Sequence, residues 1–391
     1  MLRIIHTADV HLGARHDDLG EQASAQRERQ FAAFKAAIDL ALAEKVDLFL
    51  VAGDLFDSNV QPRRSVERVA AELKRLVDGR IRTVIIPGTH DVYDRASIYR
   101  AYDLPAMAGS HPDDGMVTVL EPERPAVHLP TLQTLVIGRV FATKRAPHSP
   151  LQDLAVAPAD SDPAVTWRIG MVHGSIAIPG RTDRDEVVVT TEEIAASGLD
   201  YLALGHWHSA QIGKAGTVTY AYAGAPEAVA LDQDRAGKVM LVTLEEGDGT
   251  RSVSVAERQV GRTGFVKLEI DAATVASQPA LVELLATRAD PDLVLDVRLV
   301  GVRRDELDLD LPEIEAALAP SFLKVRVRDM SVPALTEGPL PSPETIAGAF
   351  IRDLEARIAA LETAGSTAEA AEERDALRLG RLLLSGHEVS L

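Results

Sequence analysis

Two polar side chains, Asp9 and His11, follow the first apolar run of the chain. That run, from Leu2 to Ile5, predicts a buried parallel strand that ends just before them. We expect locally extended backbone here, in which residues two apart point the same way, so that a carboxylate and an imidazole converge. Such a pair is half of a metal site. Because Asp-x-His also occurs by chance in many loops, the rest of the chain must supply the other half.

Four later apolar runs end in the same kinds of residue. Each predicts a strand, and side chains able to bind a metal follow it directly. These are Asp54 after 46–52, Thr89, His90 and Asp91 after 82–86, His173 after 167–172, and His206 with His208 after 201–204. Because sites in α/β sheets form at the carboxyl ends of strands, we expect these loops to meet at one edge. Glycines flank the ligands and permit close backbone approach, namely Gly53, Gly88, Gly174 and Gly205.

Imidazoles and carboxylates together suit manganese, iron or zinc, and do not suit a calcium or magnesium cage. The candidate ligands also outnumber what one ion needs. Two ions roughly 3.5–4 Å apart, bridged by a carboxylate, would use them all and suit hydrolysis of a phosphate ester. Any single histidine of this kind is more often a surface or satisfied core residue. The histidines outside these turns are interpreted in that way: His6, His16, His111, His128, His148 and His387.

The composition narrows the class of protein. The chain has 391 residues, 46% of them hydrophobic, which indicates a folded protein with room for more than one domain. It has no cysteine, which excludes disulfides, thiolate zinc sites and cysteine nucleophiles. Without a leader-like or membrane-spanning apolar run, we expect a soluble cytoplasmic protein. The net charge of −18 disfavours indiscriminate nucleic-acid binding, although local cations or bound metal ions can reverse the sign at a site.

The remaining pattern predicts the elements around these turns. Apolar residues at helical spacing predict helices over about 26–44 and 62–77 that cover the sheet. A turn-rich stretch with short strands covers 110–140, and a polar loop runs on to about 165. Alternating runs at 217–222, 238–244 and 252–258 predict strands that close a second sheet.

The pattern changes at about residue 264. Strand-like and helical stretches then alternate as a compact β-α-β-α-β unit over 265–270, 279–287, 293–300, 312–319 and 323–327. Prolines at 333, 339, 341 and 343 predict a semi-rigid linker. The stretch 344–386 predicts two amphipathic helices, which usually bind a partner's groove or coiled coil.

Together, these motifs resemble the calcineurin-like metallophosphoesterases. The matching residues are Asp9-x-His11, Gly53-Asp54, Gly88-x-His90-Asp91, His173 and Gly205-His206-x-His208. The stretches 6–13 and 53–57, with 222–226 and 237–239, narrow the resemblance to the SbcD family, the Mre-type nucleases of double-strand-break repair. The motif match covers about residues 1–260, and the following unit resembles the family's capping domain in layout only.

The resemblance implies a fold class and a division into domains. The implied fold is α/β, as an α+β four-layer sandwich. A metallophosphoesterase nuclease domain would cover 1–262 and a small α/β capping domain 263–330. A proline-rich linker and partner-binding C-terminal helices would cover 331–391.

The resemblance also implies a role for each site residue. Asp9, His11, Asp54 and His208 would bind the first ion, and Asp54, His173 and His206 the second, with Asp54 bridging. His90 would protonate or stabilise the leaving oxygen, and Asp91 would orient it. Where the family has an asparagine ligand to the second ion, this chain has Thr89, a poorer neutral ligand on a shorter side chain.

The implied function is a Mn-dependent DNA exonuclease with endonuclease activity, the nuclease subunit of an SbcCD-type double-strand-break repair complex. It would use two Mn²⁺ ions, or alternatively Mg²⁺, Fe²⁺ or Zn²⁺, and work with an SbcC-type SMC-like ATPase. It would be cytoplasmic and nucleoid-associated, not membrane-bound, and homodimeric through 62–78 and 96–108. The candidate DNA contacts are Arg63, Arg64, Lys144, Arg145, Arg181 and Arg184, each of which is otherwise a solvated surface charge.

Two other functions remain open. The same fold could serve a general phosphodiesterase acting on small molecules, although such an enzyme needs neither a capping unit nor a helical tail. A non-catalytic DNA-binding scaffold whose second metal site is weakened at Thr89 is the other alternative. The presence of every other ligand, and of His90, argues against it.

Overall fold

The computed structural model describes residues 1–152, 165–182, 184–228, 233, 235–247, 250–304, 307–333 and 341–384. Residues 153–164 of the polar loop, residues 334–340 of the predicted linker, and His387 lie outside these ranges. The chain forms two compact units, Met1–Gly264 and Phe265–Leu391, which are described separately. No helix among the described residues is both long and apolar enough to cross a membrane.

The first unit contains two mixed six-stranded sheets. In the first sheet, four parallel strands lie side by side: β1 (Leu2–Thr7), β2 (Leu48–Ala52), β3 (Arg82–Ile86) and β4 (Val117–Val119). β13 (Lys238–Gly247) adds to β1 in the antiparallel direction, and β14 (Thr250–Gln259) pairs antiparallel with β13. Strands β1, β2 and β3 therefore end at the same edge, where the first three ligand turns begin.

The second sheet has the order β11-β12-β10-β7-β6-β5. Its strands are β11 (Gln211–Ala215), β12 (Val218–Tyr222), β10 (Tyr201–Gly205), β7 (Trp167–His173), β6 (Thr134–Ile137) and β5 (Ala126–Leu129). The middle four are parallel, and each outer strand is antiparallel to its neighbour. β7 and β10 carry the His173 turn and the turn with His206 and His208.

The prediction that 217–222, 238–244 and 252–258 close one second sheet is therefore wrong for two of the three runs. Only the first of them, β12, joins β10. The other two form the β13–β14 hairpin, which pairs with β1 of the first sheet. Periodicity alone did not show which edge would accept this hairpin. Without β13, β1 would have been an unpaired edge strand.

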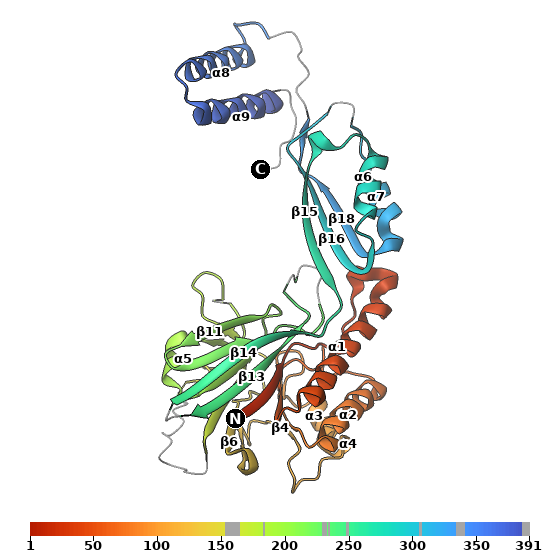
Figure 1. Ribbon diagram of the computed structural model, residues 1–391, viewed down its shortest axis with the longest axis vertical. Coiled ribbons are helices and arrows are strands. Elements are labelled where there is room, and N and C mark those ends of the chain that lie inside the picture. Colours follow the sequence, from red (N-terminus) through yellow and green to blue (C-terminus); the bar gives the residue numbers. More distant parts are fainter. Residues whose placement is uncertain are drawn as a thin grey trace. The chain divides into compact units, whose positions relative to one another are not determined.

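Alternation along the strands explains how the layers pack. In the first sheet, Ile4, Leu50 and Ile86 belong to the core between the two sheets. Their neighbours Ile5, Val51 and Ile85 pack on the other face, because successive side chains of a strand point to opposite sides. That outer face is covered by α1 (Ala23–Glu44) and α2 (Arg63–Asp78), as Figure 1 shows.

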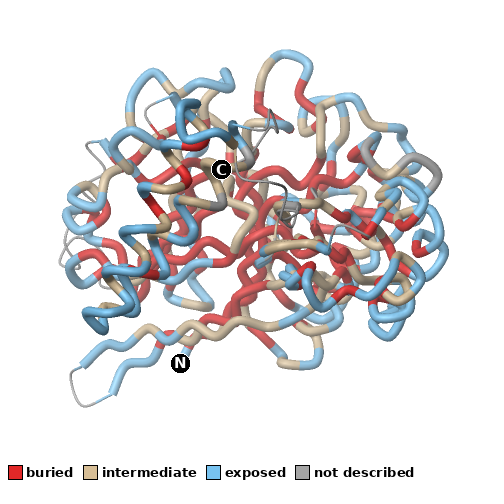
Figure 2. Tube along the Cα trace, turned by 90° about the horizontal axis from the view of Figure 1, so that it is seen from above, coloured by how far each residue is buried: buried red, intermediate tan, exposed pale blue. Residues whose placement is uncertain are grey.

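A second helical layer covers the other sheet. Ile194 of α5 (Thr191–Ala196) packs with Leu202 and Leu204 of β10 on the face turned away from the first sheet. The unit is thus a four-layer sandwich of helices, sheet, sheet and helix, as the family resemblance implied. Figure 2 shows helical segments alternating between buried and exposed residues along their length.

Shorter elements complete this unit: η1 (Asp17–Gln22), α3 (Ile98–Ala101), α4 (Leu104–Met107), η2 (Pro130–Leu132), β8 (Ser175–Ile176) and β9 (Val188–Val189). The predicted helical segment 96–108 is divided into the single turns α3 and α4. The Asp103 side chain accepts a hydrogen bond from the Ala106 N–H, and Pro105 lies in the first turn of α4. Both features start a new helix rather than continue the old one.

The second unit contains the alternating elements that the sequence predicts. They are β15 (Gly264–Asp271), α6 (Gln278–Ala286), β16 (Asp290–Val300), α7 (Leu311–Leu318) and β18 (Phe322–Asp329). The strand order is β15-β16-β18, and the core contains Leu285 of α6, Leu295 of β16 and Ile314 of α7. Short turns η4 (Ala272–Thr274) and η5 (Ala319–Ser321) accompany them, and β17 (Val302–Arg303) pairs with β19 (Val332–Pro333).

Two helices follow, α8 (Ile346–Thr363) and α9 (Thr367–Leu384). They form a hairpin around Gly365, whose φ of 75° is a conformation that glycine adopts at little cost. The ring of Phe350 lies against Gly380, and three arginine–carboxylate pairs join the helices: Arg357–Glu373, Arg374–Glu362 and Arg381–Glu355. Some of the largest apolar side chains of the hairpin remain exposed, namely Ile346, Leu383 and Leu384.

Candidate metal centre

The turns after β1 and β2 are joined by backbone hydrogen bonds. The Asp9 N–H donates to the Gly53 carbonyl at 3.1 Å, and the His11 N–H donates to the Asp54 carbonyl at 2.9 Å. A parallel bridge between Leu12 and Phe56 continues the same pairing. Strand pairing therefore extends past the strands themselves, and it places Asp9 and His11 beside Asp54.

The backbone at the candidate ligands is not extended as predicted. Asp9, His11 and Asp54 have φ values of 52°, 49° and 49°, and His206 has 97°. Positive φ is uncommon outside glycine, and it persists only where the surrounding structure holds it. The prediction that Asp9 and His11 converge through alternation is therefore wrong in its geometry. Their side chains converge through left-handed turns that the two loops impose on each other.

Two glycines permit this close packing. A Cβ atom on Gly53 would lie 2.1 Å from His173 Nδ1, and one on Gly88 would lie 2.2 Å from Asp54 Oδ1. Neither distance is sterically possible. The turns after β2 and β3 can therefore approach the ligands only because these positions carry no side chain.

One group of ligand atoms comes from Asp9, His11 and His208, which lie within 4.8 Å of one another. His11 Nε2 is 3.2 Å from His208 Nε2 and 3.6 Å from Asp54 Oδ2. All four residues belong to the set that the sequence predicts for the first ion. Two imidazole nitrogens and carboxylate oxygens that converge in this way suit a divalent transition metal.

A second group comes from Asp9, Asp54 and His173. His173 Nδ1 lies 3.0 Å from the Ala52 carbonyl, so Nδ1–H donates and Nε2 points to the site. Nε2 is buried and has no hydrogen-bond partner among the residues that the structure describes, although Asp54 Oδ2 is only 3.1 Å away. A lone pair facing a carboxylate at this distance needs a cation between them, either a proton or a metal ion.

The electrostatics favour a bound cation. Burial raises the pKa of Asp9 to about 6. Burial also opposes the charge of Asp54, but His173 and His11 lower the pKa of that carboxyl below its usual value. Desolvation disfavours protonated His173, yet Asp54 and Asp9 raise its pKa to about 10. The buried carboxylates of Asp9 and Asp54 thus stabilise a proton on the imidazole of His173. A metal ion bound among these three side chains would replace that proton.

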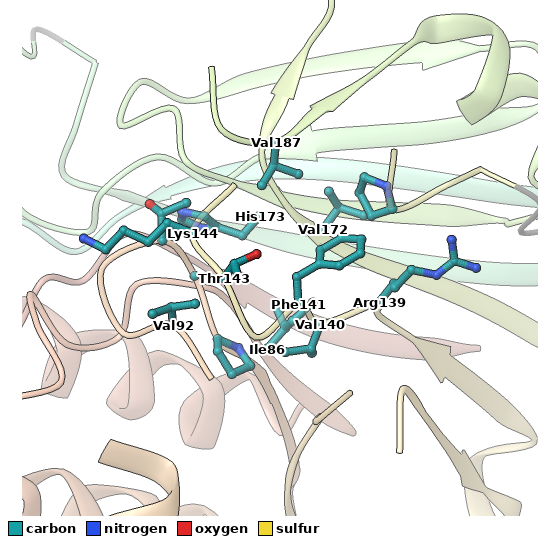
Figure 3. Close-up of a pocket in the computed structure, with 14 residues that line it drawn as sticks. Ile86, Val92, Arg139, Val140, Phe141, Thr143, Lys144, Val172, His173 and Val187 are labelled. Atoms are coloured by element: carbon teal, nitrogen blue, oxygen red, sulfur yellow. The ribbon is translucent and has the colours of Figure 1, made fainter. Parts of the chain in front are cut away.

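His206 and Thr89, both predicted near the second ion, lie beside this group. The His206 backbone N–H donates to both Asp9 oxygens, at 2.8 and 3.1 Å, and its ring centroid is 5.4 Å from that of His173. Thr89 Oγ1 is 3.5 Å from Asp54 Oδ2. Thr89 also lines a small pocket of about 30 Å³ with His173 and Lys144. In Figure 3, His173 and Lys144 lie at one side of this pocket, and Arg139 extends away at the other.

His90 and Asp91 take different positions in their turn. The His90 N–H donates to Asp54 Oδ1 at 2.7 Å, and its ring is 48% exposed, with Nδ1 3.0 Å from the Asp57 carbonyl. Asp91 is fully buried and accepts hydrogen bonds from Gly88 N–H, Phe56 N–H and the Tyr99 hydroxyl. These contacts hold the turn rather than the imidazole, so any orienting effect of Asp91 on His90 acts through the backbone.

The strands and turns that carry this site lie within the segment of the chain that matches a known protein family. The family described as calcineurin-like phosphoesterase matches residues 2–210, more than half of the chain.

The chain belongs to this family.

Several relatives of this phosphoesterase carry names from DNA repair. A protein of Aeropyrum pernix named DNA double-strand break repair protein Mre11 is 28% identical over 279 residues, which are 69% of this chain and 64% of that protein. A Halobacterium salinarum protein of the same name is 24% identical over 390 residues, 90% of this chain and 92% of that one. A Rhodobacter capsulatus protein, named as one of the subunits of the nuclease SbcCD, is 37% identical over 98 residues, 24% of this chain and 22% of that protein. The match thus spans just under two thirds of the Aeropyrum protein.

Sequence reasoning assigned no role to Asp57 of this phosphoesterase. Its Oδ1 lies 3.2 Å from His11 Nδ1, and its atoms form a third possible ligand group with His11 and His90. Burial lowers the pKa of His11, but the hydrogen bond to Asp57 and the nearby carboxylates raise it above its usual value overall. The only signal in the sequence was a second carboxylate three residues after Asp54 in the same turn.

The predicted DNA contacts are not all equally close to the site. Lys144 lines the small pocket with Thr89 and His173, and the Arg181 guanidinium lies 5.8 Å over the Trp207 ring, next to His206 and His208. All six residues are exposed. Arg145 donates to the Arg184 carbonyl, Arg63 pairs with Glu67 within the first turns of α2, and Arg64 follows it.

Proposed function

We propose that this phosphoesterase is a Mn-dependent DNA nuclease with exonuclease and endonuclease activity that works in double-strand-break repair as a subunit of an SbcCD-type complex. The observation that carries the proposal is that two ligand groups share Asp9, and that His11 of one and His173 of the other both approach Asp54 Oδ2. The relatives of the chain are named for DNA repair. Its place of action would be the nucleoid, in the cytoplasm.

The proposed ligands are those that the sequence predicts. Asp9, His11, Asp54 and His208 would hold one ion, and Asp54, His173 and His206, with Thr89 nearby, would hold the other. Asp54 suits the bridging role because its Oδ2 lies 3.6 Å from His11 Nε2 and 3.1 Å from His173 Nε2. Bound ions would lower the pKa of water and offset the charge that develops on the phosphate.

The chain itself supplies the proton for the leaving oxygen. His90 Nδ1 donates to the Asp57 carbonyl, which leaves Nε2 of the exposed ring free to carry a proton to the substrate. The Asp57 carboxylate is also close, with Oδ1 3.8 Å from the same Nδ1. His90 is thus positioned as a general acid at the edge of the metal groups.

Two surfaces suit the proposed partners. The exposed apolar residues Ile346, Leu383 and Leu384 of the α8–α9 hairpin suit a coiled coil of an SMC-like ATPase. A second copy of this chain would bind at the surface of α2, α3 and α4, which contain the predicted dimer segments 62–78 and 96–108. Sedimentation of the full chain tests the homodimer.

The direct test is a nuclease assay on linear duplex DNA with Mn²⁺ or Mg²⁺, with and without an SMC-like ATPase that co-purifies with the chain. We expect hydrolysis in Mn²⁺. Asp54→Asn should abolish it and reduce bound metal, because the variant lacks the charge that both ions would share. Hydrolysis of bis(p-nitrophenyl) phosphate without any DNA hydrolysis would favour the small-molecule alternative. Full activity of Asp54→Asn would reject the two-metal site.

A further inference from the structure

A large cavity opens beside the turn that carries His206 and His208. Its volume is about 760 Å³, and its walls include both histidines, Trp207, Arg181 and Arg235. Pockets that bind small molecules or cofactors measure roughly 300–1,000 Å³. The cavity therefore has room for a ligand group that extends away from the metal ligands.

Trp207 forms a fixed wall of this cavity. Its Nε1–H donates to Ser175 Oγ at 3.0 Å, and its ring stacks on Tyr222 with centroids 4.6 Å apart and planes 14° apart. The Tyr222 hydroxyl in turn donates to the Gly174 carbonyl and accepts from the Ile176 N–H. Tyr222 is fully buried and covers one face of the Trp207 ring, and it does not line the cavity that Trp207 lines.

Charged groups lie near Trp207. The guanidinium of Arg181 lies over the ring at 5.8 Å, and exposed Arg235 pairs with Glu257 at 3.4 Å. The carboxylate of Asp185 accepts from the same Ser175 hydroxyl that holds the indole. The cations line the cavity, whereas Asp185 and Glu257 do not.

We propose that this cavity is a nucleotide subsite, in which an unpaired base stacks on Trp207 and its phosphates contact Arg181 and Arg235. The inference rests on the proposed function and names how the substrate is held. Every base has a flat face, so stacking on an aromatic ring binds single strands whatever their sequence. It also needs no broad cationic surface, which a chain with a net charge of −18 is poorly suited to provide.

A base stacked on Trp207 cannot remain paired within a duplex. Because His206 and His208 adjoin Trp207 in the chain, the stacked nucleotide would be close to the phosphate at the metal groups. The subsite therefore selects strands that are single or unpaired at the scissile position.

Tryptophan fluorescence of the full chain tests the subsite. The chain has two tryptophans, and Trp167 is buried at the start of β7, the opposite end of that strand from His173. In the presence of a metal chelator, a short oligothymidylate should bind and quench the fluorescence of Trp207. An abasic oligonucleotide, which has the same sugar-phosphate backbone but no bases, should bind more weakly and quench the fluorescence little. Equal quenching by both would overturn the proposal.

Variants separate stacking from support of the fold. Trp207→Leu should weaken binding of the oligothymidylate roughly 5- to 150-fold, the usual effect of removing one stacking ring. Trp207→Phe should retain most of the affinity and lose the quench. Arg181→Gln should weaken binding and reduce its salt dependence. The matched control is Arg251→Ala, because Arg251 lies 5.5 Å over the other tryptophan, Trp167, and should not affect binding.

Manganese-dependent hydrolysis of the same oligonucleotide by the wild type is measured in parallel. Binding and quenching without hydrolysis would support the subsite and reject the proposed nuclease. If the wild type hydrolyses the oligonucleotide but Trp207→Leu and Arg181→Gln bind it as tightly as the wild type does, the nuclease is supported and the subsite is overturned. A far-ultraviolet circular dichroism spectrum identical to that of the wild type is required of each variant.

Discussion

Asp54 makes contacts through both of its carboxylate oxygens. Oδ1 accepts the N–H of His90 at 2.7 Å, and Oδ2 lies 3.1 Å from His173 Nε2 and 3.5 Å from Thr89 Oγ1. One side chain thus fixes the turn that carries His90 and meets His173, a candidate ligand of the other sheet. It does so from a left-handed backbone conformation, with φ 49°. A strained residue at the centre of such a site is typical of function rather than of packing.

His90 contacts this carboxylate through its backbone and not through its ring, so its side chain can be removed without removing a proposed ligand. His90→Asn should bind metal like the wild type and turn over DNA roughly 10²- to 10⁴-fold more slowly, the usual contribution of a positioned acid–base group. Metal content by mass spectrometry and turnover are measured on the same sample. Loss of metal together with activity would show that His90 is a ligand.

Thr89 should make the second ion bind more weakly than the first. The pocket of about 30 Å³ beside Thr89 has room for a longer side chain, since one water needs roughly 10–15 Å³. Thr89→Asn should therefore add an amide oxygen and tighten the second site by on the order of 10-fold. Calorimetric titration with Mn²⁺ should resolve two affinities in the wild type. An unchanged or weaker second affinity in Thr89→Asn would mean that the site is built around threonine.

At the scale of elements, the site depends on how β1 and β10 of the two sheets are held together. His6 of β1 is fully buried, and its Nδ1 lies 2.8 Å from the Tyr201 hydroxyl of β10. This hydrogen bond crosses between the sheets a few residues before the ligand turns begin. Burial lowers the pKa of His6 to about 3, so its imidazole stays neutral in the folded protein.

This contact predicts a pH dependence of stability. Below about pH 6.5 the unfolded chain protonates His6 while the folded chain does not, so the free energy of unfolding falls as the pH falls. Between pH 7 and pH 5 the wild type should lose about 2 kcal/mol more than His6→Gln, which has no titrating group there. Urea unfolding of both proteins measures the difference. Parallel pH curves would show that His6 takes up a proton without cost.

At the scale of the whole molecule, the two units have separate cores. The phosphoesterase unit carries every residue assigned to the metal groups, and the second unit carries its own three-stranded sheet. The α8–α9 hairpin has few buried residues, among them Ile351, Leu354 and Ala370. A hairpin with so small a core is suited to binding rather than to independent stability.

Removal of the hairpin should therefore affect assembly and not chemistry. The cut belongs after Pro333, because Val332 and Pro333 of β19 pair with β17. The shortened chain should retain manganese-dependent nuclease activity and no longer co-purify with the ATPase. Pull-down and nuclease assays on the same preparation measure both. Retention of the ATPase by the shortened chain would place the partner's binding surface elsewhere.

The sequence by itself determined the succession of elements along the chain, the extent of most of them and the type of residue at each turn. These are local properties: apolar runs, helical spacing and side chains at strand ends are readable within a few residues. The four-layer fold followed from resemblance, through motifs that span about 260 residues.

Only the tertiary structure decided which groups meet. The hydrogen bond of His206 to Asp9 and the approach of His11 to His208 each join residues 197 apart in sequence. Likewise, the left-handed turns at Asp9 and Asp54, the pairing of the β13–β14 hairpin with β1, and the stacking of Trp207 on Tyr222 depend on distant partners. Local propensity cannot encode such contacts, because they form only when separate strands and sheets pack together.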